Sequence, residues 1–340
     1  MRQNSRLAFA FGVAAFNHQD YILEHLESIK YLVLAYGADI DVDLIINDDC
    51  SVDQTRILID GWLEINMDLF RNVKTIYNPK NLGTCASVNN ILMHLVADRC
   101  KLSGGDDVYS FENIFELTQH KSDVAILSGR ALHLLGLELK IDHTSNILAT
   151  ATQLIYQHDN LLHRFKHFSI NNAPNILYAN ECILQANVRA YLQAFDVMED
   201  WPLQVAIARQ FPERRFELID EVLVYYRRTV GSTYIVANKR FIKDKIQMYD
   251  DLIKYESRWI ERIRLASRKF CFKSKNSLVN RLMNLDLYFF ILSCAPRAFC
   301  IISQSKALNM HLEKHRQHYE RIRSSTVAIR AYMGYLSVDD

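Results

Sequence analysis

The sequence has few of the residues that break or cross-link regular structure. With 5 prolines and 10 glycines among 340 residues, it leaves little room for long disordered segments. Its 7 cysteines are odd in number and form no C-x-x-C pair, so neither a disulfide framework nor a zinc knuckle is expected, and a reducing, cytoplasmic compartment fits best. A chain of this length is expected to form about two domains.

The chain also lacks an excess of charge of either sign. Lysine and arginine number 40 against 39 aspartates and glutamates, for a formal net charge of +1. Binding of nucleic acid through bulk positive charge is therefore not expected. A secretory signal is not expected either, because the apolar run 7–16 leads at once into Asn17 and Asp20 without a small-residue cleavage site.

Two glycine-rich phosphate-binding motifs are missing. The run 7–16 is not followed by G-x-G-x-x-G, and no G-x-x-x-x-G-K-[ST] occurs. Residues 12–20 also lack the Gly- and Arg/Lys-rich loop that a nucleotidyltransferase would need, and Ser103 and Ser128 lie in no nucleophile elbow, so hydrolase chemistry is not expected. A nucleotide bound here would depend on acidic groups and a metal ion.

What the sequence does have is a regular alternation of apolar runs and helical patterns from residue 7 to about residue 110. This order predicts an α/β fold with a Rossmann-like, mostly parallel sheet flanked by helices. Strands are expected at 7–16, 42–46, 73–77, 123–128, 175–185, 216–219 and 222–226. Helices are expected at 20–36, after residue 55, around 87–97, at 187–194 and from about residue 199.

Polar residues follow the expected strands at the point where each one ends. Asn17, Asp48-Asp49, Asn81 and Asp106-Asp107 should converge on one edge of the sheet, where ligands bind in such folds. Gly104-Gly105 allows a tight turn before the last pair. Carboxylates are the ligands that Mg²⁺ and Mn²⁺ prefer, together with substrate phosphates. The alternative for this stretch is a solvated turn.

A third acidic pair, Glu199-Asp200, opens a later helix that tolerates Pro202 in its first turn. Asp200 is placed either to cap the first amides of that helix or to act as a general base. Asp49 likewise either accepts a hydrogen bond from a ligand or stabilises its own turn.

The composition changes after about residue 236. We expect a domain at 1–235 and a helical, Lys- and Arg-rich region at 236–340. The apolar run 287–303 contains Pro296 and Arg297 and is marginal in length for a membrane span. It is expected either to lie on a membrane surface, where basic residues meet anionic lipids, or to pack as an amphipathic helix against the core or a second subunit of a homodimer.

Two histidines, His163 and His167, are spaced i, i+4, but no third ligand accompanies them in the sequence. They are therefore expected on a solvated helix face rather than in a metal site.

The order of these motifs over about residues 7–233 resembles that of family 2 glycosyltransferases with the GT-A fold, of the type that builds bacterial surface polysaccharides such as O-antigen or capsule. The matching elements are Ala14–Asn17, Asp48–Thr55, Asn78–Gly83 with Asn89, Gly104–Asp107, Glu199–Leu203 and Val222–Arg227.

This resemblance implies an inverting transfer of a sugar from a nucleoside diphosphate sugar, with a UDP-sugar favoured, to a glycan or lipid-linked acceptor at the inner face of the plasma membrane. It implies Asp200 as the catalytic base, and Mn²⁺ or Mg²⁺ on Asp106 and Asp107. The donor-binding residues that it implies are Phe16, Asn17, Asp48, Asp49, Ser51, Asn81, Gly83, Asn89, Gly105, Asp106, Glu199 and Arg227.

Three positions depart from the family pattern. Gly104 replaces the first aspartate of the metal motif, Val88 stands where an arginine is common, and Thr229 stands where a histidine is common. Arg227 or Arg228 is the expected substitute for the missing positive charge. These departures keep open an alternative, a catalytically silent binding or assembly subunit with the same fold.

Overall fold

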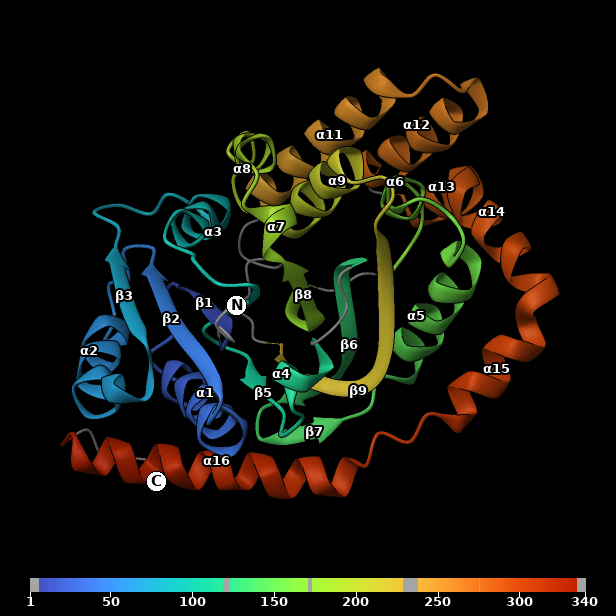
Figure 1. Cartoon of the computed structure of the whole chain (residues 1–340). Coiled ribbons are helices and arrows are strands. Elements are labelled where there is room, and N and C mark those ends of the chain that lie inside the picture. Colours follow the sequence, from blue (N-terminus) through green and yellow to red (C-terminus); the bar gives the residue numbers. More distant parts are fainter. Residues whose placement is uncertain (1–5, 119–122, 171–172, 229–237, 275, 335–340) are drawn as a thin grey trace, which may run out of the picture.

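The computed structural model of the chain describes residues 6–118, 123–170, 173–228, 238–274 and 276–334. One sheet runs through the molecule in the strand order β3-β2-β1-β4-β8-β6-β9-β5, with β7 added beside β6 (Figure 1). Thr229, one of the three departures from the family pattern, lies outside the described residues.

The first half of the sheet is parallel, and its two central strands are buried on both faces. It consists of β1 (Leu7–Ala15), β2 (Ile40–Asp48), β3 (Asn72–Tyr77) and β4 (Arg99–Gly104). Ala15 lies opposite Asp48 on β2, and Ala14 lies opposite Gly104 on β4. The carboxyl ends of three neighbouring strands therefore stand level with one another.

The second half of the sheet is mixed. Its strands are β5 (Val108–Tyr109), β6 (Val124–Leu135), β7 (Glu138–Lys140), β8 (Ile176–Ala179) and β9 (Arg215–Arg227). Only the β6–β9 pair is parallel here. Two expectations need correction: the strands at 216–219 and 222–226 are one continuous strand, and the strand expected at 175–185 ends at Ala179, where a short helix begins.

Helices cover both faces of the sheet. On one face, α1 (Ile22–Tyr36) buries Ile22, Leu26 and Ile29 at helical spacing and ends at Gly37, as the sequence predicts. It packs with α2 (Thr55–Asn66), which is followed by η1 (Met67–Leu69). The other face carries α3 (Thr84–Met93), α6 (Leu161–Lys166), α7 (Asn180–Ile183), α8 (Ala186–Leu192) and α9 (Asp200–Gln210). The short helix α4 (Ile114–Leu117) buries Ile114 and Phe115 on the face of α1, and η2 (Ala173–Asn175) leads into β8.

The C-terminal helices pack onto the sheet domain rather than standing apart from it. From α11 (Asn238–Tyr255), the side chains of Met248, Tyr249 and Leu252 enter the same apolar cluster as the sheet, and Leu265 of α12 (Trp259–Lys273) joins them. The last helix, α16 (Leu312–Tyr332), runs along the opposite edge of the molecule beside α1 (Figure 1).

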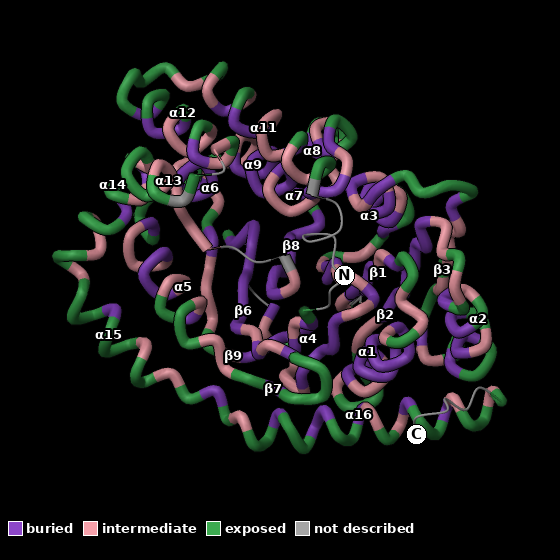
Figure 2. Tube along the Cα trace, turned by 180° about the vertical axis from the view of Figure 1, so that it is seen from behind, coloured by how far each residue is buried: buried purple, intermediate pink, exposed green. Residues whose placement is uncertain are grey.

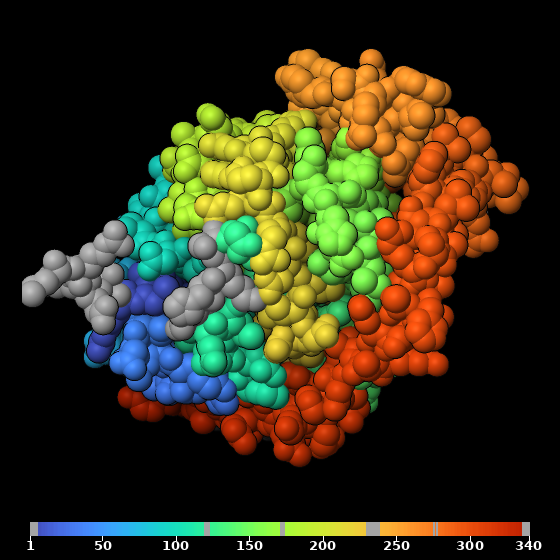
Figure 3. All heavy atoms as spheres, turned by 45° about the vertical axis from the view of Figure 1, so that its right-hand side comes forward, coloured from blue at the N-terminus to red at the C-terminus, as the bar shows by residue number. Residues whose placement is uncertain are grey.

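The remaining helices of the C-terminal region, between α12 and α16, lie on the outside of the molecule. They are α13 (Ser277–Met283), α14 (Leu285–Cys294), η3 (Ala295–Arg297) and α15 (Ala298–Ala307). Phe290 and Ile301 pack against α5 (His143–Tyr156), and Figure 3 shows these helices as an outer layer beside it. Figure 2 shows most of their length as exposed or partly exposed.

Candidate active site

The ends of β2 and β4 are fixed to the end of β1 by backbone hydrogen bonds. The amide of Asp49 donates to the carbonyl of Ala15 over 2.8 Å, and the amide of Gly105 donates to that of Ala14 over 3.0 Å. The first two acidic pairs therefore flank a single strand end. This is the edge at which parallel α/β sheets bind ligands.

Asp48 is buried and holds the turn that follows β2. Its carboxylate accepts hydrogen bonds from the amide and hydroxyl of Ser51, and from Nε of Arg56 at 2.6 Å. The oxygens of Asp48 are thus committed inside the protein. Asp48 and Ser51 therefore fix the turn after β2 through their hydrogen bonds to each other.

Asp49 organises the next loop. Its carboxylate accepts hydrogen bonds of 2.8 Å from the side-chain amide of Asn78 and from the backbone amides of Leu82 and Gly83. Gly83 has φ of 91°, and a Cβ there would lie 2.4 Å from the carbonyl oxygen of Asp196. Only glycine fits this position without moving backbone.

The loop after β1 joins the same turn. Asn17 adopts φ of 54°, its amide donates to Ser51 Oγ over 2.8 Å, and its Oδ1 accepts from the amide of Val52 at 2.9 Å. The neighbouring ring of Phe16 is 42% exposed. An exposed aromatic ring on an ordered loop is the kind of surface on which a planar base stacks.

The two aspartates of the metal motif differ in their surroundings. Asp106 is partly exposed and its Oδ1 lies over Gly104, where a Cβ would approach it to 2.6 Å. Asp107 is buried, and its Oδ1 accepts a 3.0 Å hydrogen bond from the amide of Arg227. Burial, and then the charge of Asp106, raise the pKa of Asp107 well above its usual range. These hard oxygen ligands fit a divalent cation, with Asp106 as the accessible member.

Two basic side chains lie buried beneath this loop. His25 Nδ1 donates to the carbonyl of Asp107 over 2.8 Å, and Lys101 Nζ donates to the carbonyl of Pro174 over 2.6 Å. Burial lowers the pKa of His25 to about 4 and that of Lys101 to about 7. His25 is therefore neutral at physiological pH and supports the loop through hydrogen bonds.

Arg227 is not directed to the site. Its guanidinium is buried, pairs with Glu24, donates from Nε to the carbonyl of Asp106 over 2.8 Å, and lies over the ring of Tyr21. Arg227 therefore holds the metal motif in position through hydrogen bonds to Asp106 and Asp107. The sequence implied a donor-binding role for Arg227, whereas its hydrogen bonds are committed to the protein.

The third acidic pair begins α9. Asp200 is the first residue of the helix, and its Oδ1 accepts from the amide of Trp201 at 2.7 Å. Burial, and then the charge of Asp200, raise the pKa of Glu199 to about 8. Burial also raises the pKa of Asp200. Between the two carboxylates, the charge effect is that of Asp200 on Glu199.

The charges of Asp200 and of the metal motif both act on Tyr226 of β9. Burial, followed by the charges of Asp107, Asp106 and Asp200, raises the pKa of Tyr226 to about 12. On the other side, Cys85 of α3 donates its amide to the carbonyl of Asp196 over 3.1 Å. The loops carrying the three acidic pairs are therefore contiguous around one centre.

The loop before α9 is held by a carboxylate that the sequence pattern did not identify. Asp244 of α11 is buried, and its Oδ2 accepts hydrogen bonds from the amides of Asp196, Val197 and Met198 at 2.9, 2.7 and 3.1 Å. It lies in a helix without a motif around it, so no local signal identifies it. Its role depends on the tertiary contact.

The sequence pattern did not identify Arg240 either. It pairs with Asp196 and donates from Nη1 to Asn81 Oδ1 over 3.2 Å, and its guanidinium is partly exposed. By contrast, Val88 is buried in the core and Asn89 is buried with an Oδ1 that accepts no hydrogen bond from the described residues. Arg240 is thus a guanidinium placed beside the loop of Asn81 and Gly83.

The family described as Glycosyl transferase family 2 matches residues 11–172 of this chain. Among curated protein sequences, none matches it. Its fold is similar to TarS 1–349 of S. aureus in complex with UDP-GlcNAc, at 16% identity and a TM-score of 0.54, over 94% of this chain and 92% of that one. It is also similar to the mannosyltransferase PcManGT of Pyrobaculum calidifontis in complex with GDP-Man and Mn²⁺, at 13% identity and a TM-score of 0.55, over 96% and 87%. These likenesses confirm the expected GT-A fold. Over residues 11–172, the chain is therefore similar to glycosyl transferase family 2.

Proposed function

We propose that this protein is an inverting, metal-dependent glycosyltransferase that moves a sugar from a nucleoside diphosphate sugar to a glycan acceptor. The observation that carries the proposal is the contiguity of the three acidic pairs around the strand ends. Two of them flank the end of β1, and the loop before the third accepts a hydrogen bond from Cys85, which follows the Gly83 amide that Asp49 holds. A UDP-sugar is the favoured donor.

On this proposal, the nucleoside occupies the loops around Asn17 and Asp49, with Phe16 as the stacking surface. Because Asp49 already holds the amides of Leu82 and Gly83, it keeps this loop in shape as well as offering an acceptor to the base. Asn81, Gly83 and Gly105 line the same edge, and Asn89 lies beneath it.

The diphosphate needs positive charge. Mn²⁺ or Mg²⁺ would be held by Asp106, supported by Asp107, and when bound it supplies a Lewis acid to the departing diphosphate. Arg240 is the further cation that we assign to the donor, because it contacts Asn81 and its guanidinium is partly exposed. Arg227 instead keeps the metal motif in position.

Asp200 is proposed as the base that takes the proton from the acceptor hydroxyl as its oxygen attacks the anomeric carbon. Burial and the charge of Asp200 raise the pKa of Glu199 to about 8, which favours the protonated form of Glu199. Asp200 is the member of the pair that we assign as the proton acceptor.

The acceptor is proposed to be lipid-linked and met at a membrane surface, in the synthesis of a surface polysaccharide such as O-antigen or capsule. Among the described residues, Leu285–Ala307 is long and apolar enough to cross a membrane on length and composition alone, and 17% of its most apolar window is buried. Leu292 and Phe299 are 68% and 83% exposed. Such a face beside basic helices suits peripheral contact with anionic lipid.

Flotation of the protein with vesicles tests the membrane part. Binding to vesicles containing anionic lipid, weakened by Leu292→Ser with Phe299→Ser, supports it. A homodimer that buries the same helices, seen by light scattering without vesicle binding, would contradict it.

A catalytically silent subunit is the second candidate, favoured by Gly104 and by the internal hydrogen bonds of Asp107. Donor hydrolysis with Mn²⁺ separates the two. Release of nucleoside diphosphate from one nucleotide sugar, lost in Asp106→Ala, supports the transferase. Binding of nucleotide without turnover in any acceptor mixture supports the silent subunit.

A further inference from the structure

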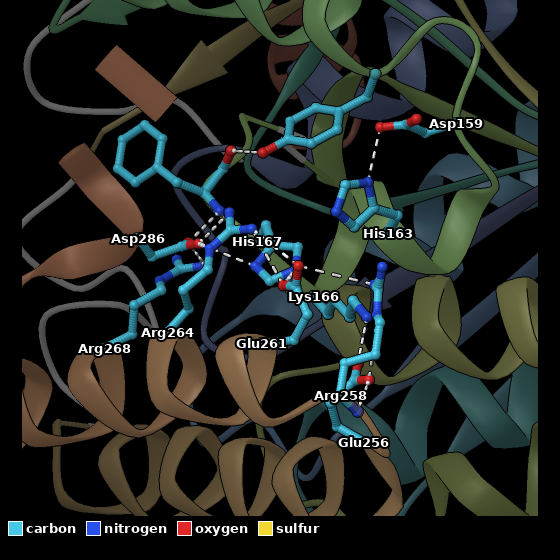
Figure 4. A network of polar contacts seen from close by, with 12 residues as sticks. Asp159, His163, Lys166, His167, Glu256, Arg258, Glu261, Arg264, Arg268 and Asp286 are labelled. Atoms are coloured by element: carbon cyan, nitrogen blue, oxygen red, sulfur yellow. Dashed lines mark hydrogen bonds and ion pairs between the residues drawn. The ribbon is translucent and has the colours of Figure 1, made fainter. Parts of the chain in front are cut away.

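The pair His163 and His167 meets a third ligand that lies far away in the sequence. Glu261 of α12 approaches both histidines, and the three side chains offer ligand atoms that all lie within 4.8 Å of one another (Figure 4). The sequence prediction of a solvated helix face is wrong for His167, which is 1% exposed. Sequence spacing could not find Glu261, because the third ligand comes from the C-terminal region.

Each histidine is oriented by a carboxylate. Nδ1 of His163 lies 2.7 Å from Asp159, and Nδ1 of His167 lies 2.9 Å from Asp286. Asp286 also accepts from the amide of Phe168 and from Arg264, so it is an ionised acceptor and Nδ1 of His167 carries the hydrogen. This leaves Nε2 of each ring for another partner. Metal-binding histidines are held in this way by carboxylates behind them.

The Nε2 atom of His167 has no hydrogen-bond partner among the described residues, although it is buried. Oε2 of Glu261 lies 2.5 Å from it, without the alignment of a hydrogen bond. Two electron-pair donors therefore face each other in the protein interior. A positive centre between them would relieve that repulsion.

We propose that Nε2 of His163, Nε2 of His167 and the carboxylate of Glu261 bind a transition metal ion, with Zn²⁺ the best match to a His₂Glu set. Zn–N and Zn–O bonds of about 2.0 Å place tetrahedral ligand atoms about 3.3 Å apart. The ligands thus need small side-chain shifts to reach that geometry. The fourth position would be taken by water, beside a cavity of about 230 Å³ that His163, Asp159 and Arg264 help to line.

The surrounding charge is balanced enough to accept a cation. Arg264 donates to Glu261 over 3.1 Å and to Asp286, Arg258 lies 3.8 Å from Glu261, and Arg268 lies 3.2 Å from Asp286. Against these stand the carboxylates of Glu261, Asp286 and Asp159, and Glu256 pairs with Lys166 and Arg258. Figure 4 shows these groups meeting between α6 and the C-terminal helices.

The consequence is a cross-link between two parts of the chain. His163 and His167 belong to the segment around α6, which packs on α9, where Trp201 Nε1 donates to the carbonyl of Phe165 over 2.7 Å. Glu261 belongs to α12. The metal would fasten the C-terminal helices to the segment that supports the helix of Asp200.

The test is a titration of the purified full-length protein with Co²⁺, followed by visible absorption. A tetrahedral site with two imidazoles gives strong visible bands, whereas octahedral oxygen ligands give weak ones. We expect bands that saturate at about one Co²⁺ per chain and that Zn²⁺ abolishes by displacement. Zn²⁺ should also raise the Tm of the metal-free protein by a few degrees.

Three variants make the test specific. His163→Ala should abolish the bands and the rise in Tm, and His163 is partly exposed, so this change leaves the core intact. His158→Ala, at an exposed histidine near by, and Asp106→Ala, in the nucleotide site, should leave both unchanged. The proposal is overturned if strong bands are absent in the wild type, if they persist in His163→Ala, or if they disappear in Asp106→Ala. Circular dichroism of each variant verifies that it is folded.

Discussion

At the scale of single residues, position along the sheet identified the acidic pairs, but only the structure shows the state of each carboxylate. Asp48 and Asp107 are committed to internal hydrogen bonds, while Asp106 remains partly exposed. The sequence implied that Arg227 binds the donor, but its guanidinium pairs with Glu24, which lies about two hundred residues earlier in the chain. Such a pairing cannot be predicted from local pattern, because it depends on how distant elements pack.

The buried pair of Glu199 and Asp200 predicts a pH-dependent stability. The pKa of Glu199 is about 8 in the folded protein and near 4.5 when unfolded, so the unfolded chain ionises first as the pH rises. The free energy of unfolding should therefore fall between about pH 4.5 and pH 8. Glu199→Gln should flatten this fall in urea denaturation series at pH 5, 7 and 9. Equal slopes for the two proteins would contradict the raised pKa.

The proposed base predicts a loss of turnover without a loss of fold. Asp200→Asn keeps the size of the side chain but removes the proton acceptor, so kcat should fall by at least ~10²-fold. Nucleotide affinity should change little, because the base acts on the acceptor. Asp68→Asn, at an exposed aspartate in η1, is the matched control. Retention of wild-type kcat in Asp200→Asn would assign this carboxylate a structural role.

At the scale of elements, the apolar runs predicted β1 and β2 closely, because the sequence of a strand buried on both faces is a continuous apolar segment. β3 was predicted at nearly its observed bounds, although its residues are exposed or half-buried. The prediction failed at residues 180–185, where apolar residues belong to α7 instead. A short apolar run does not distinguish a buried strand from a buried helix. The apolar pattern also could not show that α11 holds the loop before α9.

The contact from α11 predicts that stability and activity depend on Asp244. Its carboxylate accepts three backbone amides of the loop 196–198, so Asp244→Ala should lower the free energy of unfolding by about 3 kcal/mol. It should also lower kcat, since that loop precedes Glu199.

Asp250→Ala on the same helix is the control, because its carboxylate lies at the surface beside Lys269 and such pairs contribute about 0–1 kcal/mol. Urea denaturation and donor turnover measure both effects. Equal losses in the two variants would contradict the role of Asp244.

At the scale of the whole molecule, α16 connects the end of the chain to the beginning. Tyr319 donates its hydroxyl to Glu24 over 3.1 Å, and Glu24 also pairs with Arg227 of β9. Three elements, α1, β9 and α16, therefore meet behind the metal motif. The basic, apolar composition after residue 236 predicted helices. It did not predict that α11 and α12 would pack into the apolar cluster of the sheet and that α16 would pack against α1.

This buried junction predicts a large effect of removing one partner. Glu24→Ala leaves the guanidinium of Arg227 buried without its carboxylate, which should lower the free energy of unfolding by about 3–5 kcal/mol. Glu64→Ala, at an exposed position of α2, should change it by less than about 0.5 kcal/mol. A Glu24→Ala protein as stable as the Glu64→Ala protein would mean that the junction contributes nothing to the fold.

The most direct test of the central claim is calorimetric titration of the purified protein with UDP, GDP and dTDP, each with and without Mn²⁺. We predict that one nucleotide, most favourably UDP, binds in the presence of Mn²⁺, binds much more weakly without it, and loses the metal-dependent part in Asp106→Ala. Absence of binding by all three nucleotides in the presence of Mn²⁺ would contradict a nucleotide-sugar transferase.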